Sequence, residues 1–79
     1  MSELTDFLNK LSACSLIVLT AASEERLYCR FFLNGVYMDG MFVSAPALVA
    51  QLRQLQGEGE EIDSRGIVLL KQLHGVPVS

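Results

Sequence analysis

The sequence predicts a single small α+β domain with the element order α-β-β-β-α, followed by a last element that is either a helix or a strand. Three observations predict it: an amphipathic segment opens the chain, three strand-like segments follow, and an Asn-Gly dipeptide joins the last two. The strands are expected to form a three-stranded antiparallel meander, with the helices packed mainly on one face. The chain of 79 residues has the length of one domain, so residues 1–79 are assigned to it.

The first element is predicted to be a helix that begins after Ser2, a suitable N-cap residue. Apolar residues then recur at the i, i+3, i+4, i+7 spacing of one helix face. These residues are Leu4, Phe7, Leu8 and Leu11.

Residues 16–21 form a continuous apolar run that includes β-branched residues. A short run of this composition, between small and polar residues, is typical of a strand covered on both faces. We therefore expect this strand in the middle of the sheet, followed by a polar turn at residues 22–25.

The strongest structural signal is Asn34-Gly35, which lies between two strand-like segments at residues 26–33 and 36–43. This dipeptide is favoured in type I′ two-residue turns because both central residues adopt positive φ. A turn of this type fixes the pairing of the two strands residue by residue. The sequence therefore predicts a regular hairpin.

The predicted register sorts the hairpin side chains onto two faces, because successive residues of a strand point to opposite sides. The uncharged face, expected to pack on the core, carries Leu27, Cys29, Phe31, Leu33, Val36, Met38, Gly40 and Phe42. The opposite, amphipathic face carries Arg26, Tyr28, Arg30, Phe32, Tyr37, Asp39, Met41 and Val43. Arg30 and Asp39 are expected to pair directly across the two strands.

A second helix is predicted after the hairpin, with Ser44 as its N-cap, Pro46 in its first turn and Gly57 at its end. Its apolar stripe consists of Leu48, Val49, Leu52 and Leu55. The last element, residues 67–73, stays open between helix and strand. Its apolar run has strand composition, but a cap at Asp63 or Ser64 favours a helix.

Composition argues against several function classes. Six Lys and Arg stand against nine Asp and Glu, which gives a formal net charge of −3, so a basic nucleic-acid-binding surface is not expected. The longest apolar run is far shorter than the roughly 20 residues of a membrane span. Neither a secretory signal nor a membrane segment is visible, and a cytoplasmic location is predicted.

Small size makes the core marginal, so a partner chain is expected, most simply as a homodimer. The two cysteines, Cys14 and Cys29, are not closely spaced. We expect them to be free and buried, since free Cys is a common core residue and a reducing compartment is predicted.

No residue pattern indicates an enzyme. His74 is the only histidine and lies far in sequence from both cysteines. The chain has none of the short spacings of a zinc site and no phosphate-binding glycine motif. We therefore predict no enzymatic activity, no metal and no cofactor. The acidic cluster Glu58, Glu60 and Glu61 lacks the pattern of a calcium loop and is a secondary candidate surface for a partner.

The leading candidate site is the amphipathic hairpin face, because Tyr, Phe, Met and Arg are enriched at the centres of protein interfaces. Its candidate residues are Tyr28, Arg30, Phe32, Tyr37, Asp39 and Met41. The alternative is that a helix of the same chain covers this face.

The predicted function is a non-enzymatic protein-binding module, either a small inhibitor of the kind that phages and mobile elements encode or an accessory subunit of a larger protein assembly. One alternative is a small dimeric chaperone or adaptor that holds a client segment on its sheet. Another is a small-ligand binding protein that uses a pocket between helix and sheet.

Overall fold

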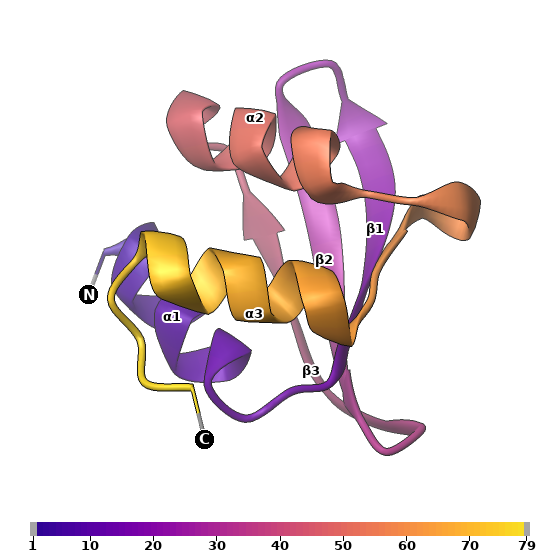
Figure 1. Cartoon of the computed structure of the whole chain (residues 1–79). Helices are drawn as coiled ribbons and strands as arrows, with labels where there is room; N and C mark the ends of the chain where they lie inside the picture. The colour runs from indigo at the N-terminus through magenta and orange to yellow at the C-terminus, as the bar shows by residue number, and fades with distance from the viewer. Residues whose placement is uncertain (1, 79) are drawn as a thin grey trace.

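Figure 1 shows the structure, a computed structural model that describes residues 2–78. In chain order the elements are α1 (Glu3–Leu11), β1 (Leu16–Ser23), β2 (Arg26–Leu33), β3 (Val36–Val43), α2 (Pro46–Leu55), the 3₁₀ turn η1 (Glu58–Glu60), β4 (Glu61–Ile62) and α3 (Ser64–Leu73). The strands form one antiparallel sheet in the order β3-β2-β1-β4. The three α-helices lie on one side of this sheet. The predicted α+β class is confirmed.

A single core lies between the helices and one face of the sheet. The helices contribute Phe7, Leu11, Leu48, Val49, Leu52, Ile67 and Leu70, and the strands contribute Ile17, Leu19, Leu27, Cys29, Phe31, Val43 and Ile62. The rings of Phe7 and Phe31 pack edge to face, with centroids 5.6 Å apart. The helices thus share one apolar face, and no described helix packs on the opposite face of the sheet.

The sheet has one more strand than the predicted meander. The two-residue strand β4 pairs with β1, so that Ile62 lies opposite Ile17 and Glu61 opposite Val18. A segment of this length has no periodicity that a sequence pattern can reveal. The expectation that β1 is covered on both faces is wrong: Ile17 is fully buried, but Leu16 and Val18 on the other side are only partly buried.

The tight turn of the β2–β3 hairpin agrees with the prediction. Asn34 has φ 51° and Gly35 has φ 82°, the positive values that a type I′ turn requires. The pairs next to the turn are Leu33–Val36 and Phe32–Tyr37, as predicted.

Beyond these pairs the predicted register is wrong. A β-bulge at Met38 adds one residue to β3, so that Phe31 pairs with Asp39 and Arg30 pairs with Gly40. The predicted Arg30–Asp39 pair therefore does not form. Because side chains alternate along a strand, one extra residue moves every later side chain of β3 to the other face.

Glu3 links the start of α1 to the start of α2. The predicted N-cap Ser44 is wrong, because the N-cap position is Ala45 and has no side-chain cap. The Glu3 carboxylate accepts hydrogen bonds from the backbone N–H groups of Ser44 (2.9 Å) and Ala45 (2.8 Å) instead. Partial burial acts to raise the pKa of Glu3, but these hydrogen bonds and the charge of Arg26 outweigh it and lower the pKa.

The last element is a helix, and Asp63 is its N-cap. The Asp63 carboxylate accepts hydrogen bonds from the N–H groups of Arg65 (3.0 Å) and Gly66 (3.1 Å). Gly66 is buried against β4, where a Cβ atom would lie 2.6 Å from Cγ2 of Ile62. Glycine at this position therefore allows α3 to approach the short strand closely.

We predict that Gly66→Ala lowers the melting temperature. Alanine is about 1 kcal/mol better than glycine in a helix interior, but overpacking of a core contact costs about 1–3 kcal/mol. Thermal unfolding followed by circular dichroism measures the balance. The control is Gly57→Ala, because a Cβ at Gly57 would have no neighbour closer than 3.9 Å. A raised melting temperature for Gly66→Ala would contradict the close approach.

We also predict that Glu3→Gln destabilises the fold near pH 7, by about 1 kcal/mol, the usual contribution of a helix cap. A carboxyl with a lowered pKa stabilises the folded state above its ordinary value of 4.5 and loses this contribution as the pH falls through the lowered value. The melting temperatures of the two proteins should therefore converge in acid. A constant difference down to pH 2 would show that the negative charge of Glu3 is not involved.

Candidate functional site

The outer face is the side of the sheet that points away from the helices. Strand pairing places on it Leu16, Val18, Thr20, Arg26, Tyr28, Arg30, Phe32, Tyr37, Gly40, Phe42 and Glu61. Every side chain of the described core belongs to the other face, to the helices or to the link after α1. The outer face thus presents its aromatic side chains without a covering layer from the described chain.

Four of the six predicted site residues lie together on the outer face, namely Tyr28, Arg30, Phe32 and Tyr37. The other two do not. Met41 pairs with Cys29 and packs against the core, whereas Phe42, which was assigned to the core face, lies on the outer face opposite Tyr28. Both errors come from the bulge at Met38, for which Gly40 inside the strand is the available sequence signal.

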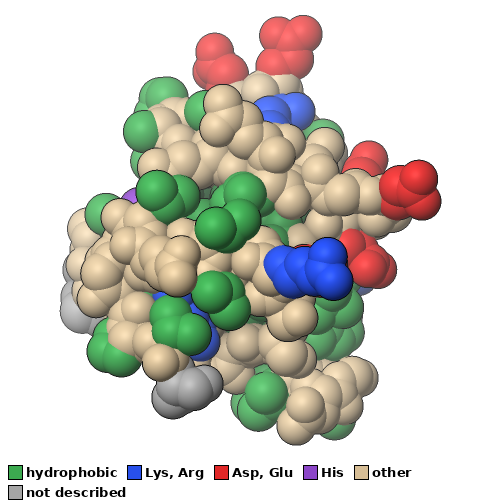
Figure 2. Space-filling view, viewed as in Figure 1, with side chains coloured by type: hydrophobic (Ala, Val, Ile, Leu, Met, Phe, Trp, Pro, Cys, Tyr) green, Lys and Arg blue, Asp and Glu red, His purple; other side chains and the backbone are tan. Residues whose placement is uncertain are grey.

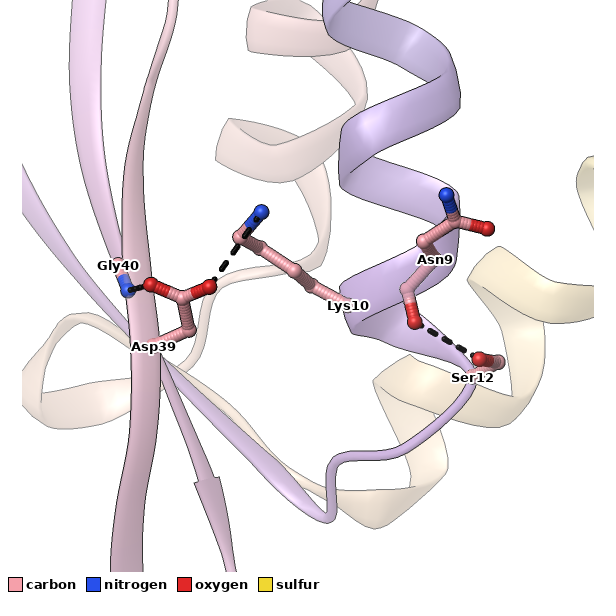
Figure 3. Close-up of polar contacts among 5 residues, drawn as sticks. All are labelled: Asn9, Lys10, Ser12, Asp39 and Gly40. Atoms are coloured by element: carbon pink, nitrogen blue, oxygen red, sulfur yellow. Dashed lines mark hydrogen bonds and ion pairs between the residues drawn. The ribbon is translucent and has the colours of Figure 1, made fainter.

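Asp39 points toward α1 (Figure 3). Its carboxylate lies 3.5 Å from Nζ of Lys10 and accepts a 2.8 Å hydrogen bond from the N–H of Gly40. In the same view, Ser12 closes the end of α1 by donating to the carbonyl of Asn9. The exposed ion pair itself contributes little stability. The pair shows that the bulged part of β3 lies beside α1.

The aromatic rings of the outer face pack against one another. The Tyr28 and Phe42 centroids are 4.8 Å apart, and the Phe32 and Tyr37 rings meet edge to face at 5.7 Å. The guanidinium carbon of Arg26 lies 3.8 Å from the Phe42 centroid, which is a cation–π contact. These contacts arrange the rings before any partner binds.

Gly40 provides the space in which two tyrosine hydroxyls meet. A Cβ atom at Gly40 would lie 2.8 Å from the hydroxyl of Tyr37 and closer still to that of Tyr28. A hydrogen bond with Tyr28 raises the pKa of Tyr37 above its ordinary value. Glycine inside a strand is a sequence signal for a close approach of this kind.

The most exposed apolar side chains of the sheet belong to β3 and the hairpin turn. Tyr37 is 51% exposed and Phe42 is 45% exposed. Leu33, Val36 and the bulge residue Met38 are also exposed, but alternation turns Leu33 and Val36 away from the outer face. Large apolar groups gathered on one exposed surface are typical of interaction sites.

The outer face also carries two arginines without a carboxylate partner. Arg30 donates a 3.4 Å hydrogen bond to the Thr20 hydroxyl. Within residues 2–78, the Lys10–Asp39 pair is the only salt bridge closer than 4.0 Å. The guanidinium groups of Arg26 and Arg30 therefore have no protein anion in direct contact.

The acidic cluster predicted as a secondary surface lies at the β4 edge of the sheet. Glu58, Glu60 and Glu61 are all exposed, and Gly59 and Glu60 have positive φ values of 72° and 57°. The described residues contain no group of three or more His, Cys, Asp or Glu side chains that could hold a metal ion. Figure 2 shows acidic side chains at the periphery of the helical side, around η1 and beyond the β1–β2 turn.

The histidine lies at the end of a helix, and the two cysteines are buried. His74 caps the end of α3, and its Nε2 lies 2.8 Å from the side-chain oxygen of Gln51. Cys14 and Cys29 are free and buried, as predicted. Burial raises the pKa of Cys14 to about 11 and that of Cys29 to about 12, so both remain protonated thiols near neutral pH.

A cavity of about 390 Å³ lies between α2 and the β1–β2 turn, away from the outer face. It is lined by Glu24, Glu25, Ser44, Pro46, Val49, Ala50 and Arg53. The Arg53 guanidinium is already engaged, because it donates to the carbonyls of Ser23 (3.4 Å) and Glu24 (3.0 Å). This cavity is the place that a small-ligand function would use.

Exposed apolar side chains also occur on the helical side, where Figure 2 shows several of them. Leu69 and Leu73 lie one turn apart on α3 and are 47% and 64% exposed, and Leu4 on α1 is 40% exposed. None of the described helices combines the length and hydrophobicity that crossing a membrane requires. Comparisons with family models, curated proteins and solved structures found no match for this chain.

Proposed function

We propose that this chain is a non-enzymatic protein-binding module that uses its outer face to occupy a surface of a larger protein, as a small inhibitor or an accessory subunit. The supporting observation is that all three helices pack on the other face of the sheet. They leave the packed rings of Tyr28, Phe32, Tyr37 and Phe42 without a cover.

The energetics of the outer face suit this function. Burying one large apolar side chain contributes about 1.5–3 kcal/mol. The rings already hold one another in place, so little conformational entropy is lost when a partner orders them. Binding energy would therefore concentrate on a few aromatic anchors, as is usual at protein interfaces.

The edge of β3 suits this function less well than its face. The bulge at Met38 interrupts the regular strand. The Asp39 carboxylate accepts a hydrogen bond from the N–H of Gly40 and contacts Lys10. Bulges and charged side chains are the usual devices that prevent another strand from pairing with a sheet edge. The partner is therefore expected to pack on the outer face rather than to extend the sheet.

We predict that Phe42→Ser abolishes partner capture, whereas Leu69→Ser retains it. The two side chains have nearly equal exposure, 45% and 47%, on opposite sides of the molecule. The measurement is affinity capture from lysate of the source cells, followed by titration of the purified partner. A hot-spot loss of about 2 kcal/mol weakens the Kd roughly thirtyfold. Equal losses with both variants, or unfolding of Phe42→Ser, would contradict the proposal.

The exposed apolar side chains on α1 and α3 support a second candidate, a dimeric adaptor. In this arrangement the helical side pairs with a second copy while the outer face holds a client segment. The helical residues concerned are Leu4, Leu69 and Leu73.

Sedimentation equilibrium at micromolar concentration tests this second candidate. We expect a dimer of the 8.7 kDa chain that Leu69→Ser with Leu73→Ser converts to monomer and that Phe42→Ser leaves intact. A single monomeric species across the concentration range would exclude the dimer.

A further inference from the structure

We infer that the protein segment bound by the outer face is acidic, with carboxylates placed on either side of an apolar residue. This inference rests on the proposed function and names the chemistry of its partner. The observation that carries it is the charge of the outer face, which differs in sign from the charge of the whole chain.

The chain has a formal net charge of −3, but the charged side chains that β2 places on the outer face are both cationic. Arg26 and Arg30 are the charged residues that β2 contributes to it. The bulge places Asp39 on the opposite side, next to Lys10. Among the described residues, the one acidic residue that strand pairing puts on this face is Glu61 of β4, which lies in the same row as Arg30 with Val18 between them.

Both arginines are positioned, and neither forms a salt bridge with a carboxylate of residues 2–78. Arg26 lies over the Phe42 ring at 3.8 Å, and Arg30 is held by the Thr20 hydroxyl at 3.4 Å. A partner that covers these guanidinium groups with apolar surface would leave two charges buried and unpaired, which is strongly unfavourable. A carboxylate instead forms short, charge-assisted hydrogen bonds with the planar guanidinium.

The strand geometry sets the spacing of the partner carboxylates. Arg26 and Arg30 lie four residues apart on one face of β2, with Tyr28 between them, which corresponds to about 13 Å along an extended strand. An extended segment lying along β2 would therefore present two acidic residues four positions apart and an apolar residue midway, over the Tyr28–Phe42 pair.

Two other occupants fit the outer face less well. A second copy packed face to face offers one carboxylate of strand-paired residues, Glu61, to two arginines, so one guanidinium would lack a partner. Single-stranded nucleic acid requires several cations and free ring faces for stacking. Here the rings already pack against one another, and Arg26 covers one side of Phe42.

The test is a selection of random 12-residue peptides, displayed on phage, against the purified full-length chain. We expect the selected peptides to be rich in Asp and Glu next to aromatic or aliphatic residues. Synthetic copies should bind at least tenfold more weakly to Arg30→Glu and to Arg26→Glu, and more weakly at high salt. The control is Arg65→Glu, an exposed arginine on α3, which should bind as the wild type does.

The variants separate failure of this inference from failure of the proposed function. Peptides that lose binding to Phe42→Ser but bind Arg30→Glu as well as the wild type would overturn the acidic partner and leave the proposed function standing. Peptides that bind both variants like the wild type would contradict both. If Phe42→Ser instead converts a dimer of the chain into monomer, the occupant is a second copy and the inference is wrong.

Discussion

The bulge at Met38 decides which side chains β3 turns away from the core. Without it, Asp39 would lie opposite Arg30 on the outer face and Phe42 would point at the helices. With it, Asp39 contacts Lys10, Val43 is fully buried, and Phe42 packs on Tyr28 under the guanidinium of Arg26. One additional residue thus adds Phe42 to the aromatic rings of the outer face and removes Asp39 from beside its arginines. The bulge also interrupts β3, an edge strand of the sheet, and so hinders the strand of another molecule from pairing with it.

The position of the helices explains why the outer face is uncovered. A chain of this size has one core. Here the apolar stripes of all three helices pack into that core, on the same side of the sheet. Glu3 helps to hold the arrangement, since its carboxylate binds the backbone at the start of α2, 41 residues further along the chain. No helix remains in the described chain to cover the aromatic rings, so their exposure is a consequence of the packing.

The outer face combines rigidity with unbalanced charge. Its rings contact one another, the hydroxyls of Tyr28 and Tyr37 meet over Gly40, and the arginines are oriented without a carboxylate beside them. Rigid aromatic groups supply affinity at a low cost in conformational entropy, and oriented charges supply specificity and fast association. These properties support the proposed binding of another protein. The two thiols are buried, and His74 is hydrogen-bonded to Gln51.

Local sequence determined the α+β class, the first helix with its Ser2 cap, the type I′ turn at Asn34-Gly35 and the cap at Asp63, because each depends on the chemistry of neighbouring residues. It also placed Tyr28, Phe32 and Tyr37 on one face, since all three follow from alternation close to the turn or along β2. Tertiary structure decided the rest. The bulge places Asp39 beside Lys10 of α1 and Val43 in a core shared with all three helices. The strand β4 exists only because β1 lies beside it, and the cap of α2 comes from Glu3. Contacts between residues so distant in sequence leave no local pattern.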